Sequence, residues 1–290
     1  MISILISTIS ILTISISAIL ILTISISKLK IKIISNEEKD PCLEYANEVR
    51  AFLASRGCAA DIAKSEDFAP ADFCVVLGGD GTMLRVAHFA AVAGVAMLGI
   101  NLGTLGFLTD VDKKNGLKAL EKILAGEFFR EERIMLDAEF GTEKIIPTQQ
   151  RIALNEILVG EMGNLIEYSI YVNEQFITAI KADGIIVATP TGSTAYNLSA
   201  GGPILVPGGN MVAITPVCPH SLSARPWVVG ANDSIRVVAK RDSKIYIDGC
   251  MRAKIRAGEN VFVKSSEHRA AILKTTQTNF FAILRKKKLL

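Results

Sequence analysis

The sequence lacks paired metal ligands and a large excess of charge. Its five cysteines are odd in number, lie far apart and include no C-x-x-C pair, and its three histidines are equally scattered. This pattern supports neither a disulfide framework nor a zinc site, and it indicates free thiols in a reducing cytoplasm. The formal net charge is only +3, so a concentrated basic face for nucleic acid is not expected. A G-x-x-x-x-G-K-[ST] motif is also absent, which excludes a Walker-type phosphate site.

Charge is wholly absent from residues 1–27, which consist almost entirely of Ile, Leu, Ser and Thr and repeat ILTISIS at 11–17 and 21–27. Because Ile alternates with Ser or Thr and poor helix formers dominate, we predict a low-complexity hydrophobic extension without a role. A membrane anchor is a second interpretation, since the length and the lysines that follow satisfy the rules for one. A cleaved signal is a third, although no basic region precedes the apolar run.

The motif GGDGT at residues 78–82 joins a predicted buried strand at 73–77 to a predicted helix at 83–91. Glycines let the backbone approach an anion, a helix N-terminus offers free N–H groups, and Thr82 can cap the helix, so the junction is typical of a phosphate site. A carboxylate such as Asp80 repels phosphate unless it binds a metal, orients a hydroxyl or accepts a proton. It therefore indicates phosphoryl transfer. The alternative is a tight turn in which Asp80 bonds its own backbone.

The first half of the chain alternates strands and helices. We expect strands at 29–34, 73–77 and 95–100, a helix that starts with Asp40 as N-cap and Pro41 and ends at Gly57, and a helix at about 115–125. This alternation predicts an open, mostly parallel α/β sheet. A second glycine-rich loop, NLGTLGFL at 101–108, follows the third strand, and ligands of such sheets bind where both loops lie.

The second half changes to short strand-like runs with turn residues between them, which predicts an all-β sandwich-like domain. The runs are 134–140, 152–159, 165–172, 176–181, 185–188, 211–215, 235–239, 244–247 and 261–263. The basic run RKKK at 285–288 is interpreted as a solvated helix end, with a polyphosphate or membrane role as the alternative.

Polar residues in the β half indicate a ligand site. The stretch TPTGSTAY at 189–196 is followed by GGP at 201–203, and its small hydroxyl residues and Tyr196 suit a loop around a polar ligand. Asn155 and Glu156 interrupt an apolar strand and face opposite sides of it, so at least one of them is expected inside, where a ribose or an amide can satisfy it. The alternative is an exposed edge pair.

Five segments together resemble the NAD kinases, in order from about Lys30 to the end of the chain. They are GGDGT at 78–82, LGINLGTLGFL at 98–108, Asn155-Glu156, DGIIVATPTGSTAYNLSAGGPI at 183–204 and HSLSARP at 220–226. The resemblance implies a Rossmann-like open α/β domain at 28–130 and a β-sandwich domain at 131–269, with segment 270–290 returning to the first and the active site in the cleft between them. It also implies transfer of the terminal phosphoryl group of ATP, or of polyphosphate, to the 2′-hydroxyl of the adenosine ribose of NAD, which gives NADP.

The resemblance also implies the roles of single residues. Asp80 is the expected general base, and the loop residues Gly78, Gly79, Gly81 and Thr82 are expected to face the phosphates. The expected dinucleotide site is lined by Phe107, Asn155, Glu156, Lys181, Asp183, Thr194, Ala195, Tyr196, Asn197 and Ser199. Mg²⁺ or another divalent cation is expected to arrive with the nucleotide, because no protein cage is visible. A cytoplasmic homodimer or homotetramer is implied, with neither nucleic acid nor membrane as a partner.

Two features depart from the family pattern: Cys250 stands where some members have a polar side chain, and the hydrophobic extension at 1–27 is not part of the pattern. Lys181 also stands where many members have an arginine. Two other functions stay open. A lipid kinase of the same superfamily resembles this chain at GGDGT and would use the extension as an anchor, but the sequence behind the motif favours a dinucleotide. A regulatory NAD-binding module would keep the pocket without turnover, but it would gain nothing from Asp80.

Overall fold

The computed structural model describes residues 29–68, 70–104, 106–109, 111–141, 146–276 and 279–289. The extension at 1–27 lies outside them, so its three interpretations stay predictions. No helix among the described residues has the length and hydropathy that a membrane span requires.

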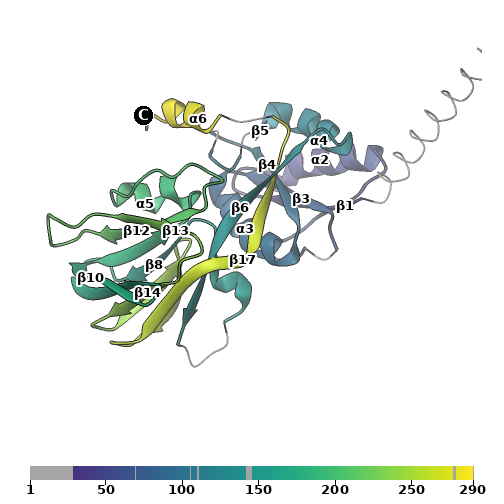
Figure 1. The fold of residues 1–290 in the computed structure, drawn as a ribbon. Helices are drawn as coiled ribbons and strands as arrows, with labels where there is room; N and C mark the ends of the chain where they lie inside the picture. Colours follow the sequence, from purple (N-terminus) through teal and green to yellow (C-terminus); the bar gives the residue numbers. More distant parts are fainter. Residues whose placement is uncertain are drawn as a thin grey trace, which may run out of the picture.

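The N-terminal part is a parallel sheet with helices on both faces (Figure 1). Its strands are β1 (Lys30–Ser35), β2 (Ala59–Ile62), β3 (Phe73–Gly78), β4 (Ala96–Asn101) and β5 (Val111–Asp112), and they pair in the order β2-β1-β3-β4-β5. Helices α2 (Glu44–Ser55) and α4 (Gly116–Leu124) bury apolar residues on one face, and α3 (Asp80–Ala93) does so on the other. The predicted α/β architecture is confirmed.

The first helix begins later than the sequence predicts. Pro41–Leu43 forms the 3₁₀ turn η1, and α2 begins at Glu44, because Cys42 and Leu43 have φ of 57° and 56°. Asp40 still satisfies the start of the helix, since its carboxylate accepts the N–H groups of Tyr45 at 2.8 Å and Ala46 at 3.0 Å. A left-handed pair of residues thus separates the capping carboxylate from the α-helix that it serves.

The C-terminal part contains two β-sheets that face each other across one apolar core, as predicted. One sheet runs β13-β12-β11-β8-β15-β16, and the other contains β10-β9-β14-β17 with β6 and β7. The bounds are β6 (Phe129–Phe140), β7 (Ile152–Ala153), β8 (Glu156–Gly160), β9 (Ile166–Val172), β10 (Gln175–Ala182), β11 (Gly184–Ala188), β12 (Met211–Val217), β13 (Trp227–Gly230), β14 (Ile235–Ala239), β15 (Ser243–Ile247), β16 (Cys250–Ile255) and β17 (Asn260–Lys274). Short helices are η2 (Lys113–Asn115), η3 (Thr148–Gln150), η4 (Gly192–Thr194), α5 (Tyr196–Ser199) and α6 (Phe280–Lys286).

One long strand connects the two parts. β17 pairs with β14 and β6 in antiparallel fashion, and near its end Ile272 pairs with Met97 of β4 in parallel fashion. Figure 1 shows β17 in yellow as it passes from the lower sheet into the α/β part. Because β6 crosses the boundary expected at 130 and β17 crosses the one expected at 269, these boundaries stay predictions.

The β half differs from the sequence prediction in detail. Strands β13 and β16 were not expected here, and the run predicted at 261–263 is only a part of β17; in the α/β half, β2 and β5 were not expected either. The run predicted at 152–159 is split into β7 and β8. The split falls at Leu154 and Asn155, whose N–H groups bond a side chain from another turn instead of a neighbouring strand.

Candidate active site

The GGDGT loop lies at the carboxyl end of β3 and leads directly into α3. Gly78 has to be glycine, because a Cβ there would overlap the Thr82 side chain. The predicted cap is wrong: Gly79 is the N-cap residue and no side chain caps the helix, while Thr82 lies in its first turn. The Thr82 hydroxyl accepts a hydrogen bond from Asn36 Nδ2 at 3.2 Å, so it ties the loop to the end of β1.

The Asp80 carboxylate holds the two glycine-rich loops together. It accepts the N–H of Phe107 at 2.7 Å, the N–H of Leu108 at 2.9 Å and the hydroxyl of Thr109 at 3.3 Å. A Cβ at Gly106 would overlap Asp80 Oδ1, which explains the glycine there. These bonds go to the second loop rather than to the turn that contains Asp80, contrary to the simple-turn alternative.

A cavity of about 460 Å³ opens over this loop. Its lining residues are Asn36, Lys39, Gly79, Asp80, Gly81, Thr82, Arg85, Thr104, Gly106 and Lys287. Three cationic side chains and one carboxylate make this lining suited to a polyanion at the start of a helix. Of the residues expected to face phosphates, Gly79, Gly81 and Thr82 line the cavity, and Gly78 lies buried behind them.

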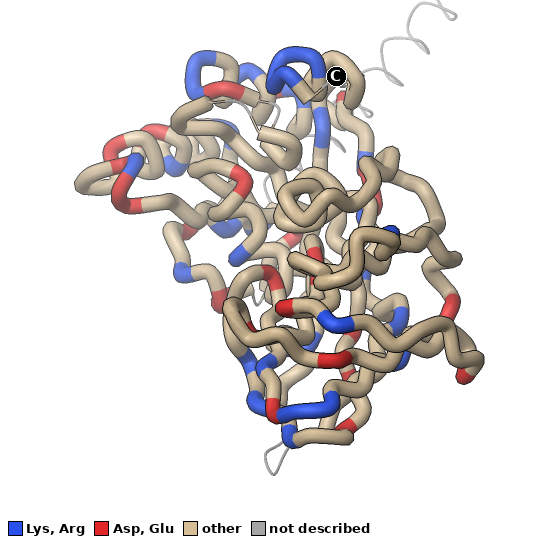
Figure 2. The backbone as a smooth tube through the Cα atoms, turned by 90° about the vertical axis from the view of Figure 1, so that its left-hand side faces the viewer, with Lys and Arg blue, Asp and Glu red and all other residues tan. Residues whose placement is uncertain are grey.

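Two of the three cations of this cavity, Lys39 and Arg85, were not predicted from the sequence, whereas a polyphosphate role was the alternative interpretation for the run that contains Lys287. Arg85 lies four residues after Gly81, so both lie on the same face of the helix, and this spacing could have indicated Arg85. Lys39 has no comparable signal. Lys287 belongs to the basic run at 285–288, which Figure 2 shows beside the C-terminus.

The C-terminal helix α6 brings Lys287 to the second glycine-rich loop. The Lys287 ammonium lies 5.0 Å from the centre of the Phe107 ring, and the Phe280 ring lies 6.0 Å from the same ring. Phe107 therefore contacts α6 through its ring while its N–H bonds Asp80.

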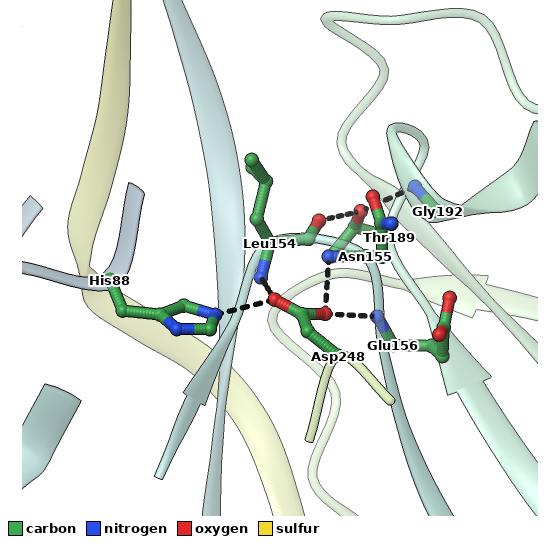
Figure 3. A network of polar contacts seen from close by, with 7 residues as sticks. All are labelled: His88, Leu154, Asn155, Glu156, Thr189, Gly192 and Asp248. Carbon is green, nitrogen blue, oxygen red and sulfur yellow. Dashed lines mark hydrogen bonds and ion pairs between the residues drawn. The ribbon is translucent and has the colours of Figure 1, made fainter. Parts of the chain in front are cut away.

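A second polar centre forms around Asp248, in the turn between β15 and β16 (Figure 3). Its carboxylate accepts the N–H groups of Leu154 at 2.8 Å, Asn155 at 2.8 Å and Glu156 at 3.0 Å. It also lies 2.6 Å from Nε2 of His88, which comes from α3. The segment that carries Asn155 and Glu156 is thus held by one buried carboxylate.

The loop at 189–196 packs on this segment, as Figure 3 shows. The Thr189 hydroxyl donates to the Leu154 carbonyl at 2.6 Å and accepts the Gly192 N–H at 3.0 Å. A Cβ at Gly192 would overlap the Asn155 carbonyl, so glycine permits this close approach. The structure therefore brings together the two polar stretches that the sequence indicated.

Glu156 is buried, with 7% of its surface exposed, so the exposed-edge alternative is wrong for this residue. Its Oε2 has no hydrogen-bond partner among the described residues. Burial, followed by the charge of Asp248, raises its pKa from 4.5 to about 8. At neutral pH the side chain is therefore mostly a neutral carboxylic acid that offers both a donor and an acceptor.

Tyr196 and Asp183 lie near the same centre. Burial first, and then Cys218, Asp183 and Glu156, raise the pKa of Tyr196, and its hydroxyl donates to Met162 Sδ at 3.1 Å. Asp183 accepts the Gly163 N–H at 3.3 Å.

The remaining predicted residues of this region differ in exposure. Thr194 and Ala195 are half-buried, whereas Lys181 and Ser199 are exposed. Asn197 is fully buried, and its amide bonds the carbonyls of Ser193 and Pro203 and the hydroxyl of Thr215. Its side chain supports the loop from inside.

Comparisons with known proteins identify the family. The ATP-NAD kinase N-terminal domain matches residues 59–128, and the ATP-NAD kinase C-terminal domain matches residues 154–275. An NAD kinase of Azoarcus sp. is 42% identical over 81% of this chain and 82% of that protein, and one of Caldanaerobacter subterraneus is 38% identical over 89% and 98%.

Two solved structures share the fold. An NAD kinase from Archaeoglobus fulgidus in complex with ATP has a TM-score of 0.75 at 25% identity, covering 89% of this chain and 99% of that one. Yeast NADH kinase complexed with NADH has a TM-score of 0.77 at 23% identity, covering 89% and 86%. On the family matches and the identities to its relatives, this chain belongs to the NAD kinase family of phosphotransferases.

Proposed function

We propose that this protein transfers the terminal phosphoryl group of ATP, or of polyphosphate, to the 2′-hydroxyl of the adenosine ribose of NAD and so makes NADP. The observation that carries the proposal is the Asp80 carboxylate beside three cations in the cavity over the glycine loop. The Archaeoglobus fulgidus relative solved with ATP supports ATP as the donor. By the same resemblance, the proposed compartment is the cytoplasm and the proposed assembly is a homodimer or homotetramer.

The cavity suits the donor phosphates. Loop N–H groups and the start of α3 face them, and Lys39, Arg85 and Lys287 neutralise the charge that spreads over the transferred group. These groups come from fixed helices and loops, so their orientation changes little during the reaction.

Asp80 is the proposed general base. An ionised carboxylate has about four acceptor sites, and the described bonds from Phe107, Leu108 and Thr109 use three of them. One site is left to accept the proton of the ribose hydroxyl, and the three donors fix the direction in which it points. A positioned base of this kind contributes about 10² to 10⁴ in rate.

The lining fits a divalent cation that the nucleotide brings with it. The Thr82 hydroxyl and the Asn36 amide oxygen line the cavity, and no group of three or more His, Cys, Asp or Glu side chains that could hold a metal occurs among the described residues, so the nucleotide's own phosphates would supply most of the ligands. When bound, Mg²⁺ neutralises phosphate charge and holds the in-line geometry.

Asp80→Asn tests the base, but it also replaces an acceptor oxygen by an amide that faces an N–H group. The matched control is Thr109→Val, which removes one bond from the second loop and keeps the carboxylate. It also removes the acceptor of Asn101 Nδ2, so it disturbs the loop as well. We expect Asp80→Asn to lose about 10²-fold or more in NADP formation, and Thr109→Val to lose less than about tenfold.

The assay uses protein without residues 1–27, incubated with NAD, ATP and Mg²⁺, and NADP is measured with an NADP-specific dehydrogenase. Equal losses in the two variants would assign the effect to loop geometry, and a nearly unchanged rate in Asp80→Asn would reject Asp80 as the base. NAD binding without NADP formation in the wild-type protein would support the regulatory-module alternative.

A further inference from the structure

Helix α3 connects the two polar centres of the molecule. It starts at Asp80, in the lining of the phosphate cavity, and carries His88 eight residues later, about 12 Å along the helix axis. His88 is 5% exposed and contacts Asp248 from the facing β-sheet part. One rigid helix therefore joins the cavity to the Asp248 centre.

Asp248 determines where the Asn155–Glu156 segment lies. Asn155 lies in the gap between β7 and β8, and Glu156 is the first residue of β8. Asp248 accepts three consecutive N–H groups here, those of Leu154, Asn155 and Glu156. The Asp248 N–H also donates to the Glu156 carbonyl at 3.0 Å. Any displacement of Asp248 therefore moves Asn155 and Glu156 with it.

His88 is the side-chain partner of this carboxylate. The Asp248 side chain is 1% exposed, so water is nearly excluded from it. Three neutral N–H groups and the imidazole complete its hydrogen bonds in Figure 3. Since a buried charge that loses its partner shifts or relaxes, loss of the imidazole is expected to move Asp248 away from its present position.

We propose that His88 is a positioning residue for the acceptor dinucleotide: through Asp248, it sets the Asn155–Glu156 segment relative to Asp80 at the other end of α3. The inference rests on the proposed function in one respect, namely that Asn155 and Glu156 contact NAD. We therefore expect the loss of His88 to weaken the binding of NAD and not that of ATP, although α3 contributes a side chain to both centres.

Two variants test the contact. His88→Leu keeps the volume and removes the donor, whereas in His88→Gln the amide Nε2 still donates to Asp248. We expect the KM for NAD to rise about tenfold or more in His88→Leu, the size of one hydrogen bond to a charged group, with the KM for ATP within about twofold. His88→Gln should restore the KM for NAD to within about threefold of wild type.

Val86→Ala is the control for general loosening of α3. Val86 is fully buried on the same helix and belongs to the core under the sheet. Val86→Ala should leave the KM for NAD and the KM for ATP within about twofold of wild type. Any one of three results would overturn the proposal. The KM for NAD could be unchanged in folded His88→Leu, it could rise equally in His88→Leu and His88→Gln, or it could rise as much in Val86→Ala.

A wild-type measurement covers the case in which His88→Leu does not fold. The chain has three histidines, so loss of one imidazole signal in His88→Gln identifies His88 in an NMR spectrum. Saturating NAD should shift this signal, and His268 in β17 serves as the reference. A His88 signal that stays in place while calorimetry shows NAD bound would overturn the proposal.

Failure of the proposed function would look different. If the wild-type protein bound NAD but formed no NADP, the reaction would be rejected. The role of His88 would then be tested with the dissociation constants for NAD instead of the KM values, and His88→Leu, His88→Gln and Val86→Ala would be compared with wild type as before.

Discussion

Glu156 contributes to the pH dependence of this protein's stability, and Glu156→Gln should remove that contribution. The folded-state pKa is about 8, against 4.5 for the free side chain. Below pH 4.5 both states bind the proton and the wild type carries no penalty. As the pH rises from 4.5 to 8, the unfolded chain releases the proton and the folded chain keeps it, so stability falls through this window.

The size of the effect follows from the shift. Each pKa unit corresponds to about 1.4 kcal/mol, so burial of Glu156 together with its repulsion by Asp248 costs on the order of 3 kcal/mol at pH 7 and on the order of 4 to 5 kcal/mol above pH 8. Glutamine has nearly the same shape and never ionises. Relative to wild type, the stability that Glu156→Gln gains should therefore grow from near zero at pH 4.5 to about 3 kcal/mol at pH 7 and about 4 to 5 kcal/mol above pH 8.

The assay is the free energy of unfolding in urea at several pH values from 4.5 to 9, for wild type and Glu156→Gln. The matched control is Glu127→Gln, because Glu127 is exposed and its substitution should leave the pH dependence of wild type unchanged. A constant difference between Glu156→Gln and wild type across this range would refute the reasoning, since it would mean that Glu156 titrates alike in both states.

Two more predictions concern the cavity over the glycine loop. Gly106→Ala places a methyl group on Asp80 Oδ1, so NADP formation should fall by about 10²-fold or more although every polar group is retained; a rate near wild type would contradict the described packing. Lys287→Met removes one cation of the cavity and should raise the KM for ATP by about tenfold with the KM for NAD unchanged, in steady-state kinetics at low salt. If both KM values rose equally, Lys287 would be acting through α6 packing and not through phosphate charge.

Much of the local structure followed from neighbouring residues. The strand at 73–77, the helix after GGDGT and its end at Gly94, which has φ of 69°, were predicted because burial, helix propensity and glycine's freedom at positive φ act within a few residues. The late start of α2 was missed, since nothing in the pattern indicated left-handed Cys42 and Leu43.

The sequence by itself therefore determined the two-part architecture, the phosphate-loop motif and the polar stretches around Asn155 and Thr189. Only the tertiary structure decided which side chains meet: Lys39, Arg85 and Lys287 converge on one cavity from three segments, and His88 meets Asp248 at a sequence distance of 160 residues. The physical reason is that such contacts depend on how sheets and helices pack across the whole fold, whereas periodicity and composition report only what each segment buries.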